Sequence, residues 1–302
     1  MNVDRKRRTL VCGLGALSLL GSLSSSASEP APLAAEQALA ELERASGGRL
    51  GVFMLDTGSG RSTGHRSDER FGMCSTFKLL LAAAVLREAD AGRLQLDTFI
   101  EYGKADLVPH APVTGANLDQ GGMRIGALAE AAQLTSDNVA ANLLLRVLGG
   151  PQRFTAILGQ MGDAVTRIDR IEPDMNLVPA GEIRDTTTPR AMAQSVSRIM
   201  TGDLLSASAR AQLAAWMIAT QTGKKRIRAG LPAAWRAGDK TGTGVAPGMP
   251  NKHNDVAIVW PPGRAPVVIA AYFEASHYFE NTRPEDDAVL AQVGRIATGW
   301  IE

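Results

Sequence analysis

The chain of 302 residues is 45% hydrophobic and 21% charged, which is the composition of an ordinary globular protein. Its 32 lysines and arginines against 31 aspartates and glutamates leave a formal net charge of +1, so nothing indicates binding to nucleic acid or to an anionic membrane surface. The two cysteines and four histidines show no metal-ligand spacing, which argues against zinc chemistry and predicts a protein without a cofactor.

The first 27 residues have the pattern of an export signal. Residues 5–8 are all basic, residues 10–23 form an apolar run, and small residues suited to signal peptidase follow near Ala27. The pattern fits a twin-arginine signal, and plain Sec export fits nearly as well. Because the run is too short to span a bilayer comfortably, we expect it to be removed, leaving a mature periplasmic protein without stable membrane association. Only Cys74 then remains, so no internal disulfide is possible.

Strands are expected near both ends of the mature chain. The apolar segment 50–55 is followed by the turn sequence DTGSG, which indicates a hairpin into a second strand. Three further strands are expected over residues 235–240, 255–260 and 266–273, and the short turns between them favour antiparallel pairing. Together these segments predict one antiparallel five-stranded sheet that is built from both termini.

Helices are expected between the two groups of strands and after the last one. Their boundaries are indicated by Pro151 in a first turn and by Gly149-Gly150 after a last turn. The expected helices cover residues 75–89, 124–134, 137–148, a segment from 151, 189–200, 206–220 and 285–300. The predicted fold class is therefore α/β (α+β), a sheet flanked by helices with an all-helical subdomain inserted. We expect one domain over residues 28–302, with the α/β part at about 28–70 and 221–302 and the all-helical part at about 71–220.

Lys78 stands at the start of an expected helix and is followed by eight consecutive apolar residues. Burying an unpaired ammonium there would cost several kcal/mol, so the Lys78 side chain either reaches water or has a functional role. Ser75 lies three residues earlier, on the same helical face. A lysine whose pKa is lowered by burial can take the proton of a serine hydroxyl and make it a nucleophile. By itself, the SxxK spacing is also typical of a helix cap followed by a surface lysine.

Two further short motifs follow in the chain. The sequence SDN occupies residues 136–138, where by itself it is a good helix cap, and KTG occupies residues 240–242, where by itself it is a common turn entry. In this order, SxxK, SDN and KTG match the motif set of class A β-lactamases and penicillin-binding proteins. The chain resembles a class A serine β-lactamase over essentially all of its mature length, from GRLGV through ERFGMCSTFK, RDTTTP and GDKTGTG to the last helix.

A long segment without clear periodicity, residues 166–185, is expected to be a functional loop. The resemblance implies that it is the omega loop, in which Glu172 and Asn176 hold the water that hydrolyses an acyl-enzyme. It also implies that Arg170 and Asp185 form the ion pair that closes the neck of this loop. Chemistry explains the need for such a loop, because an ester in a closed site is stable unless a positioned base activates water.

The resemblance further implies the roles of the residues that make and break the acyl-enzyme. Ser75 attacks the lactam carbonyl, and the backbone N–H groups of Ser75 and Thr243 form the oxyanion hole. Either Lys78, or Glu172 through a water, takes the serine proton, and the sequence leaves this choice open. Ser136 passes a proton to the departing ring nitrogen.

Other residues are implied to bind the substrate. Asn138 donates to the amide of the substrate's side chain and helps to fix Lys78, whereas Lys240, Thr241 and Thr243 form the cradle for its carboxylate. Arg226 matches a position where some members place a further carboxylate-binding arginine, although it could equally be an exposed charge.

The chain departs from the family's pattern at three places. His110 stands where the family often has tryptophan or tyrosine, which weakens any stacking argument. The disulfide partner that some carbapenem-hydrolysing members provide for Cys74 is replaced by Gly244. The segment GVAPGMPNKHND, residues 244–255, looks longer than usual, so it is either a tolerated surface insertion or an element that reshapes access to the site.

The expected function is therefore that of a β-lactamase. It would act as a periplasmic monomer without a metal, hydrolyse penicillins and cephalosporins through a covalent acyl-serine, and confer antibiotic resistance. One alternative is a D-alanyl-D-alanine peptidase, which uses the same three motifs but lacks a dedicated deacylating pair such as Glu172 and Asn176. The other is a β-lactam sensor that stays acylated; such domains are usually tethered to a membrane, and the mature sequence has no predicted span.

Overall fold

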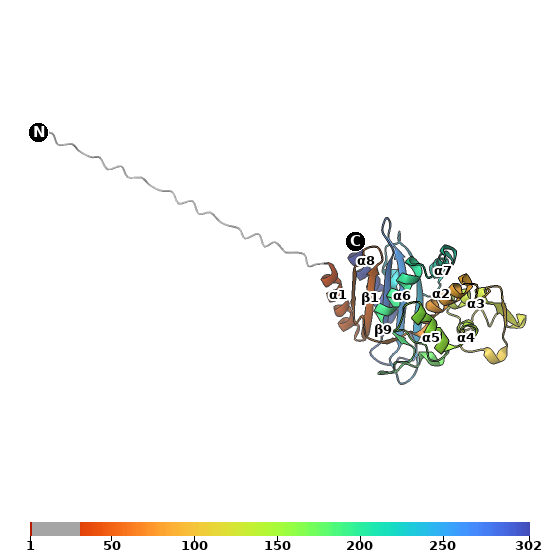
Figure 1. Ribbon diagram of the computed structural model, residues 1–302. Helices are drawn as coiled ribbons and strands as arrows, with labels where there is room; N and C mark the ends of the chain where they lie inside the picture. Colours follow the sequence, from red (N-terminus) through yellow and green to blue (C-terminus); the bar gives the residue numbers. More distant parts are fainter. Residues whose placement is uncertain (2–30) are drawn as a thin grey trace.

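The computed structural model describes Met1 and residues 31–302 of the chain. The predicted export signal, residues 1–27, therefore lies outside the described residues apart from Met1. Within the part that is described, no helix has the length and apolar character needed to cross a membrane. Residues 31–302 form a sheet with helices on both faces, and a group of helices lies beside one of these faces (Figure 1).

The main sheet has the strand order β2-β1-β9-β8-β7, and every neighbouring pair is antiparallel. Its strands are β1 (Arg49–Asp56), β2 (Ser62–His65), β7 (Arg236–Gly244), β8 (Lys252–Trp260) and β9 (Val267–Glu274). The early strand β1 lies between its hairpin partner and a late strand, since Val52 pairs with His65 on one side and with Ala271 on the other. The predicted five-stranded antiparallel sheet built from both termini is confirmed.

Helices cover both faces of the sheet, so β8 and β9 are buried along nearly their whole length rather than at alternate residues. One face packs against α1 (Ala31–Ser46) and α8 (Pro284–Ile301), and the other against α6 (Pro189–Thr201). The remaining helices are α2 (Phe77–Asp90), α3 (Ile125–Leu134), α4 (Asn138–Val147), α5 (Pro151–Gln160) and α7 (Ala207–Ala219). The helix α1 was not among the predicted elements, although its buried Ala35 and Leu39 have helical spacing.

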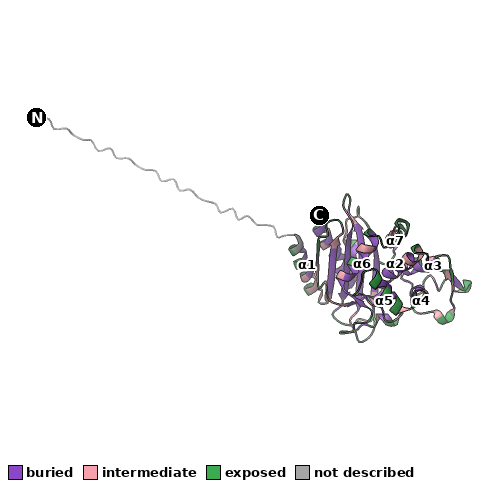
Figure 2. Ribbon diagram, viewed as in Figure 1, coloured by how far each residue is buried: buried purple, intermediate pink, exposed green. Residues whose placement is uncertain are grey.

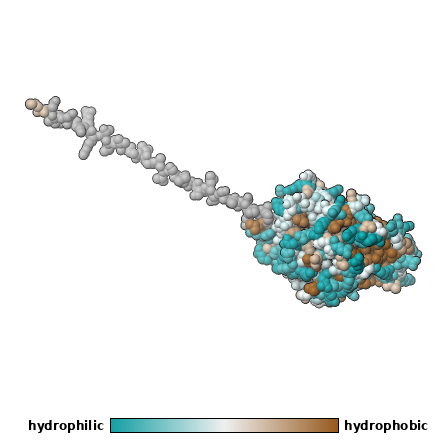
Figure 3. Space-filling view, in the orientation of Figure 1, coloured by the Kyte–Doolittle hydropathy of each residue, from teal (hydrophilic) through white to brown (hydrophobic). Residues whose placement is uncertain are grey.

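Two hydrophobic cores lie on the two sides of the sheet, and the buried apolar residues of α2 all belong to the core shared with the helical part. Every residue of α2 from Phe77 to Leu86 is buried, including Lys78. Buried residues run through the sheet and the central helices in Figure 2, whereas exposed residues mark the outer helical turns. The outer surface on the face shown in Figure 3 is mostly hydrophilic, with several separate hydrophobic patches.

The structure corrects two local expectations near the motifs. Ser75 is not part of the long helix but lies in a separate 3-10 turn, Cys74–Thr76, directly before α2. The KTG sequence lies inside β7 rather than at its end, because this strand continues to Gly244 and β8 already begins at Lys252. The predicted long loop after KTG is therefore reduced to residues 245–251.

Short strand pairs outside the main sheet connect the site to its supports. The strand β3 (Phe71–Gly72), just before the Ser75 turn, pairs with β6 (Thr186–Thr187), just after the omega loop. The second pair, β4 (Phe99–Glu101) with β5 (Gly122–Arg124), lies in the helical part. The pairing of β3 with β6 means that the chain leading to Ser75 and the chain leaving the omega loop are held side by side.

Gly244, the last residue of β7, lies directly beside the buried Cys74 thiol. A Cβ atom built on Gly244 would lie 2.9 Å from Cys74 Sγ, and the next nearest atoms are 3.7 Å or more away. A disulfide brings the Cβ of one cysteine to about 3 Å from the partner sulfur. We therefore expect Gly244→Cys to form a disulfide with Cys74 and to raise the free energy of unfolding by about 2–4 kcal/mol.

Urea unfolding with and without reductant, together with the mass of the intact protein, measures this effect. Val245→Cys, one residue further along the chain, is the matched control because it moves the new thiol off the strand. Two free thiols in the oxidised Gly244→Cys protein would show that the two positions cannot be bridged.

Candidate active site

Ser75 lies in a short turn that is held by the neighbouring strand β8. Asn254 Nδ2 donates to the carbonyl oxygens of Gly72 (2.9 Å) and Met73 (3.0 Å), which immediately precede the turn. Within the turn, Cys74 has φ = +46°, a conformation that residues other than glycine rarely adopt. Such a backbone persists only where its surroundings fix it, so we attribute the placement of Ser75 partly to Asn254.

Lys78 is completely buried, and its amino group is surrounded by oxygen atoms from three parts of the chain. Nζ lies 2.9 Å from Ser75 Oγ, from the Ser136 carbonyl oxygen and from Glu172 Oε1, and it also donates to Asn138 Oδ1. Burial lowers the pKa of Lys78, and the charge of the Glu172 carboxylate opposes this shift. The lysine is therefore close enough to Ser75 to exchange a proton with it.

Glu172 is 2% exposed and reaches Ser75 from the omega loop. Its Oε1 lies 3.4 Å from Ser75 Oγ, and Asn176 Nδ2 donates to Oε2. Its backbone is fixed by Asn142, whose Oδ1 accepts from the Glu172 N–H and whose Nδ2 donates to the Glu172 carbonyl, both at 2.9 Å. A carboxylate held in this way can take a proton from a water that stands beside an ester on Ser75.

The neck of the omega loop is closed by Arg170 and Asp185, as predicted. Arg170 Nε lies 2.6 Å from Asp185 Oδ2, and Asp185 Oδ1 accepts from the N–H groups of Asp169 (2.8 Å) and Arg170 (3.0 Å). Arg170 Nη2 also donates to the Leu177 carbonyl at 3.0 Å, which connects the neck to the far side of the loop. Because Asp185 is fully buried, removing one partner would leave an uncompensated charge in the interior.

The SDN segment places Ser136 between the two buried lysines of the site. Ser136 Oγ lies 3.1 Å from Lys240 Nζ and 3.5 Å from Lys78 Nζ, and the residue has φ = +63°. The middle residue, Asp137, points away from the lysines and caps α4. Its carboxylate accepts hydrogen bonds of 2.8–2.9 Å from Val113 N, Thr114 N, Thr114 Oγ1 and Ala140 N.

Lys240, in β7, is completely buried and contacts Ser136. Its Nζ donates to Ser136 Oγ at 3.1 Å and to the Thr241 carbonyl at 2.8 Å. Burial, and then the nearby charge of Lys78, lower the pKa of Lys240 to about 7. Thr241 Oγ1 shares a hydrogen bond of 2.6 Å with Thr222 Oγ1, and both residues line the cleft.

Arg226 is 6% exposed, so the alternative of an exposed charge is wrong. Its Nη1 donates to the carbonyl oxygens of Gly242 (2.9 Å) and Asn254 (2.7 Å), which bridges β7 and β8. Its Nη2 donates to Thr243 Oγ1 at 2.7 Å, and its Nε donates to Asp287 Oδ1 at 2.8 Å. The guanidinium therefore fixes the strand end that carries Thr243 and is itself held from α8.

These side chains surround a cleft of about 260 Å³. The cleft is lined by Ser75, His110, Ser136, Asn138, Asn176, Thr222, Arg226, Thr241 and Thr243. The remaining predicted site residues, Lys78, Glu172 and Lys240, contact members of this group, so the structure brings all the predicted residues together. His110 also lines the cleft; its φ is +65°, and its Nε2 is 2.9 Å from the Thr135 carbonyl.

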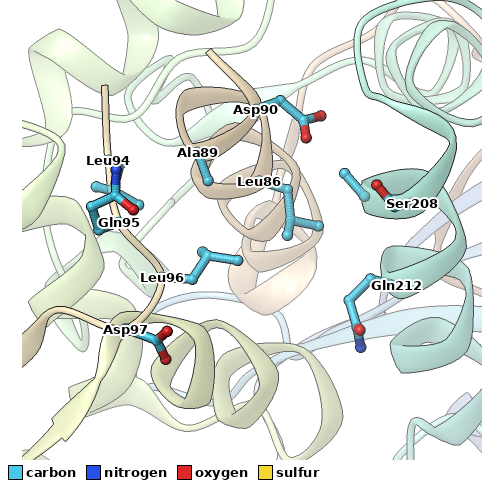
Figure 4. Close-up of a pocket in the computed structure, with 10 residues that line it drawn as sticks. Leu86, Ala89, Asp90, Leu94, Gln95, Leu96, Asp97, Ser208 and Gln212 are labelled. Atoms are coloured by element: carbon cyan, nitrogen blue, oxygen red, sulfur yellow. The ribbon is translucent and has the colours of Figure 1, made fainter. Parts of the chain in front are cut away.

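A hollow of about 420 Å³ lies at the opposite end of α2 (Figure 4). Its labelled side chains include Leu86, Leu96 and Asp90, and they come from the end of α2, the segment after it and α7. The hollow holds none of the predicted site residues, and no serine–lysine pair faces it. The smaller cleft at the start of α2 is therefore the candidate active site.

Three polar residues that support the site were not predicted from the sequence: Asn142, Thr222 and Asn254. Asn142 lies four residues after the SDN motif, on the same helical face as Asn138, but its partner Glu172 is thirty positions further on. Thr222 lies in a segment without periodicity. One signal for Asn254 was available, since it belongs to a run of four polar residues, Lys252 to Asp255, that opens a strand whose other residues are apolar.

Comparisons with known proteins agree with this geometry. The family model described as the beta-lactamase enzyme family matches residues 34–301. Beta-lactamase AST-1 of Nocardia asteroides is 48% identical over 262 residues, which cover 87% of this chain and 82% of that protein. Beta-lactamase L2 of Stenotrophomonas maltophilia is also 48% identical, over 278 residues that cover 92% of this chain and 89% of that protein.

Solved structures give the same result. The structure titled ancestral (GNCA) beta-lactamase class A is 53% identical in sequence and has a TM-score of 0.82. The match covers 87% of this chain and 98% of the ancestral protein's chain. A beta-lactamase from Xanthomonas campestris is 43% identical with a TM-score of 0.84, over 90% of this chain and 99% of its own. The sequence, the fold and these relatives agree, and the chain belongs to the family of class A serine β-lactamases.

Proposed function

We propose that this class A β-lactamase hydrolyses the lactam amide of penicillins and cephalosporins with Ser75 as its nucleophile. The single observation that carries the assignment of roles is that Ser75 Oγ lies within 2.9 Å of Lys78 Nζ and 3.4 Å of Glu172 Oε1. A serine hydroxyl needs a base to become a nucleophile, and an acyl-serine needs a base to be hydrolysed. This arrangement supplies a base for both steps.

In the first step, Ser75 Oγ forms a bond to the lactam carbonyl carbon and gives its proton to the Lys78–Glu172 pair. These two groups are 2.9 Å apart, so a proton accepted by one can be shared with the other, and we treat the pair as one base. The carbonyl oxygen gains negative charge, for which the N–H groups of Ser75 and Thr243 are the proposed donors. The carbon–nitrogen bond then breaks as Ser136 gives a proton to the ring nitrogen and regains one from the Lys78–Glu172 pair, since Lys78 Nζ lies 3.5 Å from Ser136 Oγ. Lys240, at 3.1 Å from the same hydroxyl, favours its proton loss.

In the second step, Glu172 takes a proton from a water whose oxygen bonds to the ester carbonyl carbon. The ester bond to Ser75 breaks, and the serine oxygen regains a proton from the same buried pair. Asn176 supports this role by donating to Glu172 Oε2, and Asn142 supports it by holding the backbone of Glu172. Because a peptidase or a sensor lacks such a deacylating pair, these contacts favour hydrolysis over the two alternatives.

Substrate binding is assigned to the groups around the carboxylate side of the cleft. Lys240, Thr241, Thr243 and Arg226 supply positive charge and hydroxyl donors for the β-lactam carboxylate. Asn138 is assigned to the amide of the substrate's side chain, while its Oδ1 accepts from Lys78. We further propose that the enzyme acts as a monomer in the periplasm after removal of residues 1–27 and confers resistance to these antibiotics there.

Ser75→Ala removes the proposed nucleophile without altering the packing of the buried turn. We expect the turnover of a chromogenic cephalosporin to fall by at least about four orders of magnitude, because Ser75 is the one hydroxyl among the described residues of the cleft that is hydrogen-bonded to both Lys78 and Glu172. Steady-state absorbance measurements give the rate, and thermal unfolding shows that the fold is intact. Turnover near the wild-type rate in a folded variant would exclude Ser75 as the nucleophile.

Glu172→Gln keeps the shape of the side chain but removes the base proposed for deacylation. We expect one β-lactam to remain attached to Ser75, because the ester forms through Lys78 and is then hydrolysed at least about 10²-fold more slowly. Mass spectrometry of the intact protein after brief exposure to benzylpenicillin detects this adduct. Asp174→Asn, an exposed carboxylate in the same loop, is the control and should turn over normally. If the Glu172→Gln protein neither accumulates adduct nor slows, the role of the omega loop is wrong.

The pKa of Lys240, about 7, makes recognition of the substrate's carboxylate depend on pH. Above this pH the side chain loses its proton and its charge, so the attraction for a carboxylate weakens. We expect the ratio of kcat/KM for benzylpenicillin to that for its methyl ester to fall as the pH rises from about 6 to about 8.5. In Lys240→Arg the guanidinium stays protonated, so the ratio should change much less. A ratio that does not vary with pH in the wild-type enzyme would contradict this assignment.

A further inference from the structure

His253 is a fully buried histidine that none of the proposed catalytic steps uses. It lies in β8 directly opposite Thr243 of β7, one of the residues assigned to the substrate's carboxylate. Its ring faces the first turn of α8, which carries three successive acidic residues, Glu285, Asp286 and Asp287. Nδ1 lies 3.2 Å from Asp287 Oδ1, and Nε2 lies 3.4 Å from Asp286 Oδ2.

Asp287 connects this histidine to the cleft. The same oxygen, Oδ1, that faces His253 Nδ1 also accepts from Arg226 Nε at 2.8 Å. A carboxylate oxygen can only accept, so the Nδ1 of His253 carries the proton in this contact. Burial by itself would raise the pKa of Asp287, but the hydrogen bonds and charges of His253 and Arg226 hold it below its ordinary value. Asp287 is therefore an anion held between two donors.

Arg226 has one donor left for a substrate. A guanidinium has five N–H groups, and four of them are used by Asp287 Oδ1, the Gly242 and Asn254 carbonyls, and Thr243 Oγ1. Within the described part of the chain, the fifth, on Nη2, has no partner, and this nitrogen is the one that also donates to Thr243. Since Arg226 and Thr243 both line the cleft, this N–H is the Arg226 donor that remains for a carboxylate bound there.

We propose that His253 is a positioning residue for substrate recognition, which acts through Asp287 to hold the Arg226 guanidinium in the orientation that presents its free N–H to the carboxylate of the β-lactam. This inference rests on the function proposed above and extends it to a residue that touches no substrate. Asp286, the second carboxylate at the ring, is itself held by Arg283 at 2.6 Å and 3.0 Å, so the histidine lies between an anchored anion and the anion that orients Arg226.

The competing explanation is that His253 only fills space between β8 and α8. The two explanations differ in which substrates they affect. A packing defect lowers the turnover of all β-lactams alike, whereas a displaced Arg226 causes an additional loss for substrates that carry the carboxylate. Benzylpenicillin and its methyl ester differ in that one charge, so the ratio of their kcat/KM values separates the two effects.

The experiment measures this ratio for His253→Gln in the otherwise wild-type enzyme and in an Arg226→Gln background. We expect the ratio to fall about 3- to 20-fold in the first case, and to change less than about twofold in the second, because the histidine acts through the arginine. His65→Gln, which removes another histidine–carboxylate contact (2.9 Å to Glu43) away from the cleft, is the control and should leave the ratio unchanged. If the His253→Gln protein does not fold, Asp287→Asn tests the same connection at a side chain that is 26% exposed.

Two outcomes would overturn the proposal. Equal losses for the acid and the ester would reduce His253 to a packing residue. An equal fall of the ratio in both backgrounds would show that the effect does not pass through Arg226. Neither outcome affects the proposed hydrolysis itself, which fails instead if Ser75→Ala retains turnover.

Discussion

The structure of the active site depends on one buried ammonium group, that of Lys78. A lysine inside an apolar helix is stable only if its hydrogen bonds and its charge are satisfied locally. Its partners come from the preceding turn (Ser75), from the start of α4 (Ser136 and Asn138) and from the omega loop (Glu172). The contacts that make the burial of Lys78 tolerable are therefore the contacts that assemble the catalytic groups, so the packing of α2 and the geometry of the site depend on the same side chains.

A second buried lysine, Lys240, adds another positive charge that has to be stabilised beside the cleft. Lys240 and Lys78 both lie next to Ser136 Oγ, and the charge of Lys78 is one reason why the pKa of Lys240 is low. Two ammonium groups this close repel each other unless a carboxylate neutralises one of them, and Glu172 is the group that contacts Lys78. The carboxylates of Asp239 and Asp255 raise the pKa of Lys240 and so help to keep it charged for carboxylate binding. The charges of the same few buried side chains therefore affect acylation, deacylation and recognition of the substrate's carboxylate.

The sequence predicts those parts of the fold and the site that depend on residues close together in the chain. It does not predict the contacts between residues that are far apart in the chain. The strands, the helices of the insert and the SxxK, SDN and KTG motifs are all patterns within a few residues, and they predict the sheet and the cleft. The partnership of Asn142 with Glu172 and that of Arg226 with Asp287 join positions 30 and 61 residues apart. No local pattern encodes such pairs, because they depend on how loops and strands meet in the folded chain. The burial of Arg226 was undecided for the same reason.

The backbone around the reacting groups shows what these distant contacts achieve. Cys74 and Ser136 both adopt left-handed conformations that cost a non-glycine residue about 1–3 kcal/mol each, and each lies in a motif that supplies a reacting hydroxyl. Both segments are anchored by a fully buried or nearly fully buried polar residue with no place in the reaction, Asn254 for the first and Asp137 for the second. The strained turns are stable because these side chains satisfy backbone groups that would otherwise be buried without partners. Catalytic geometry in this fold is thus maintained by hydrogen bonds to the backbone, whereas the catalytic side chains themselves remain free to exchange protons.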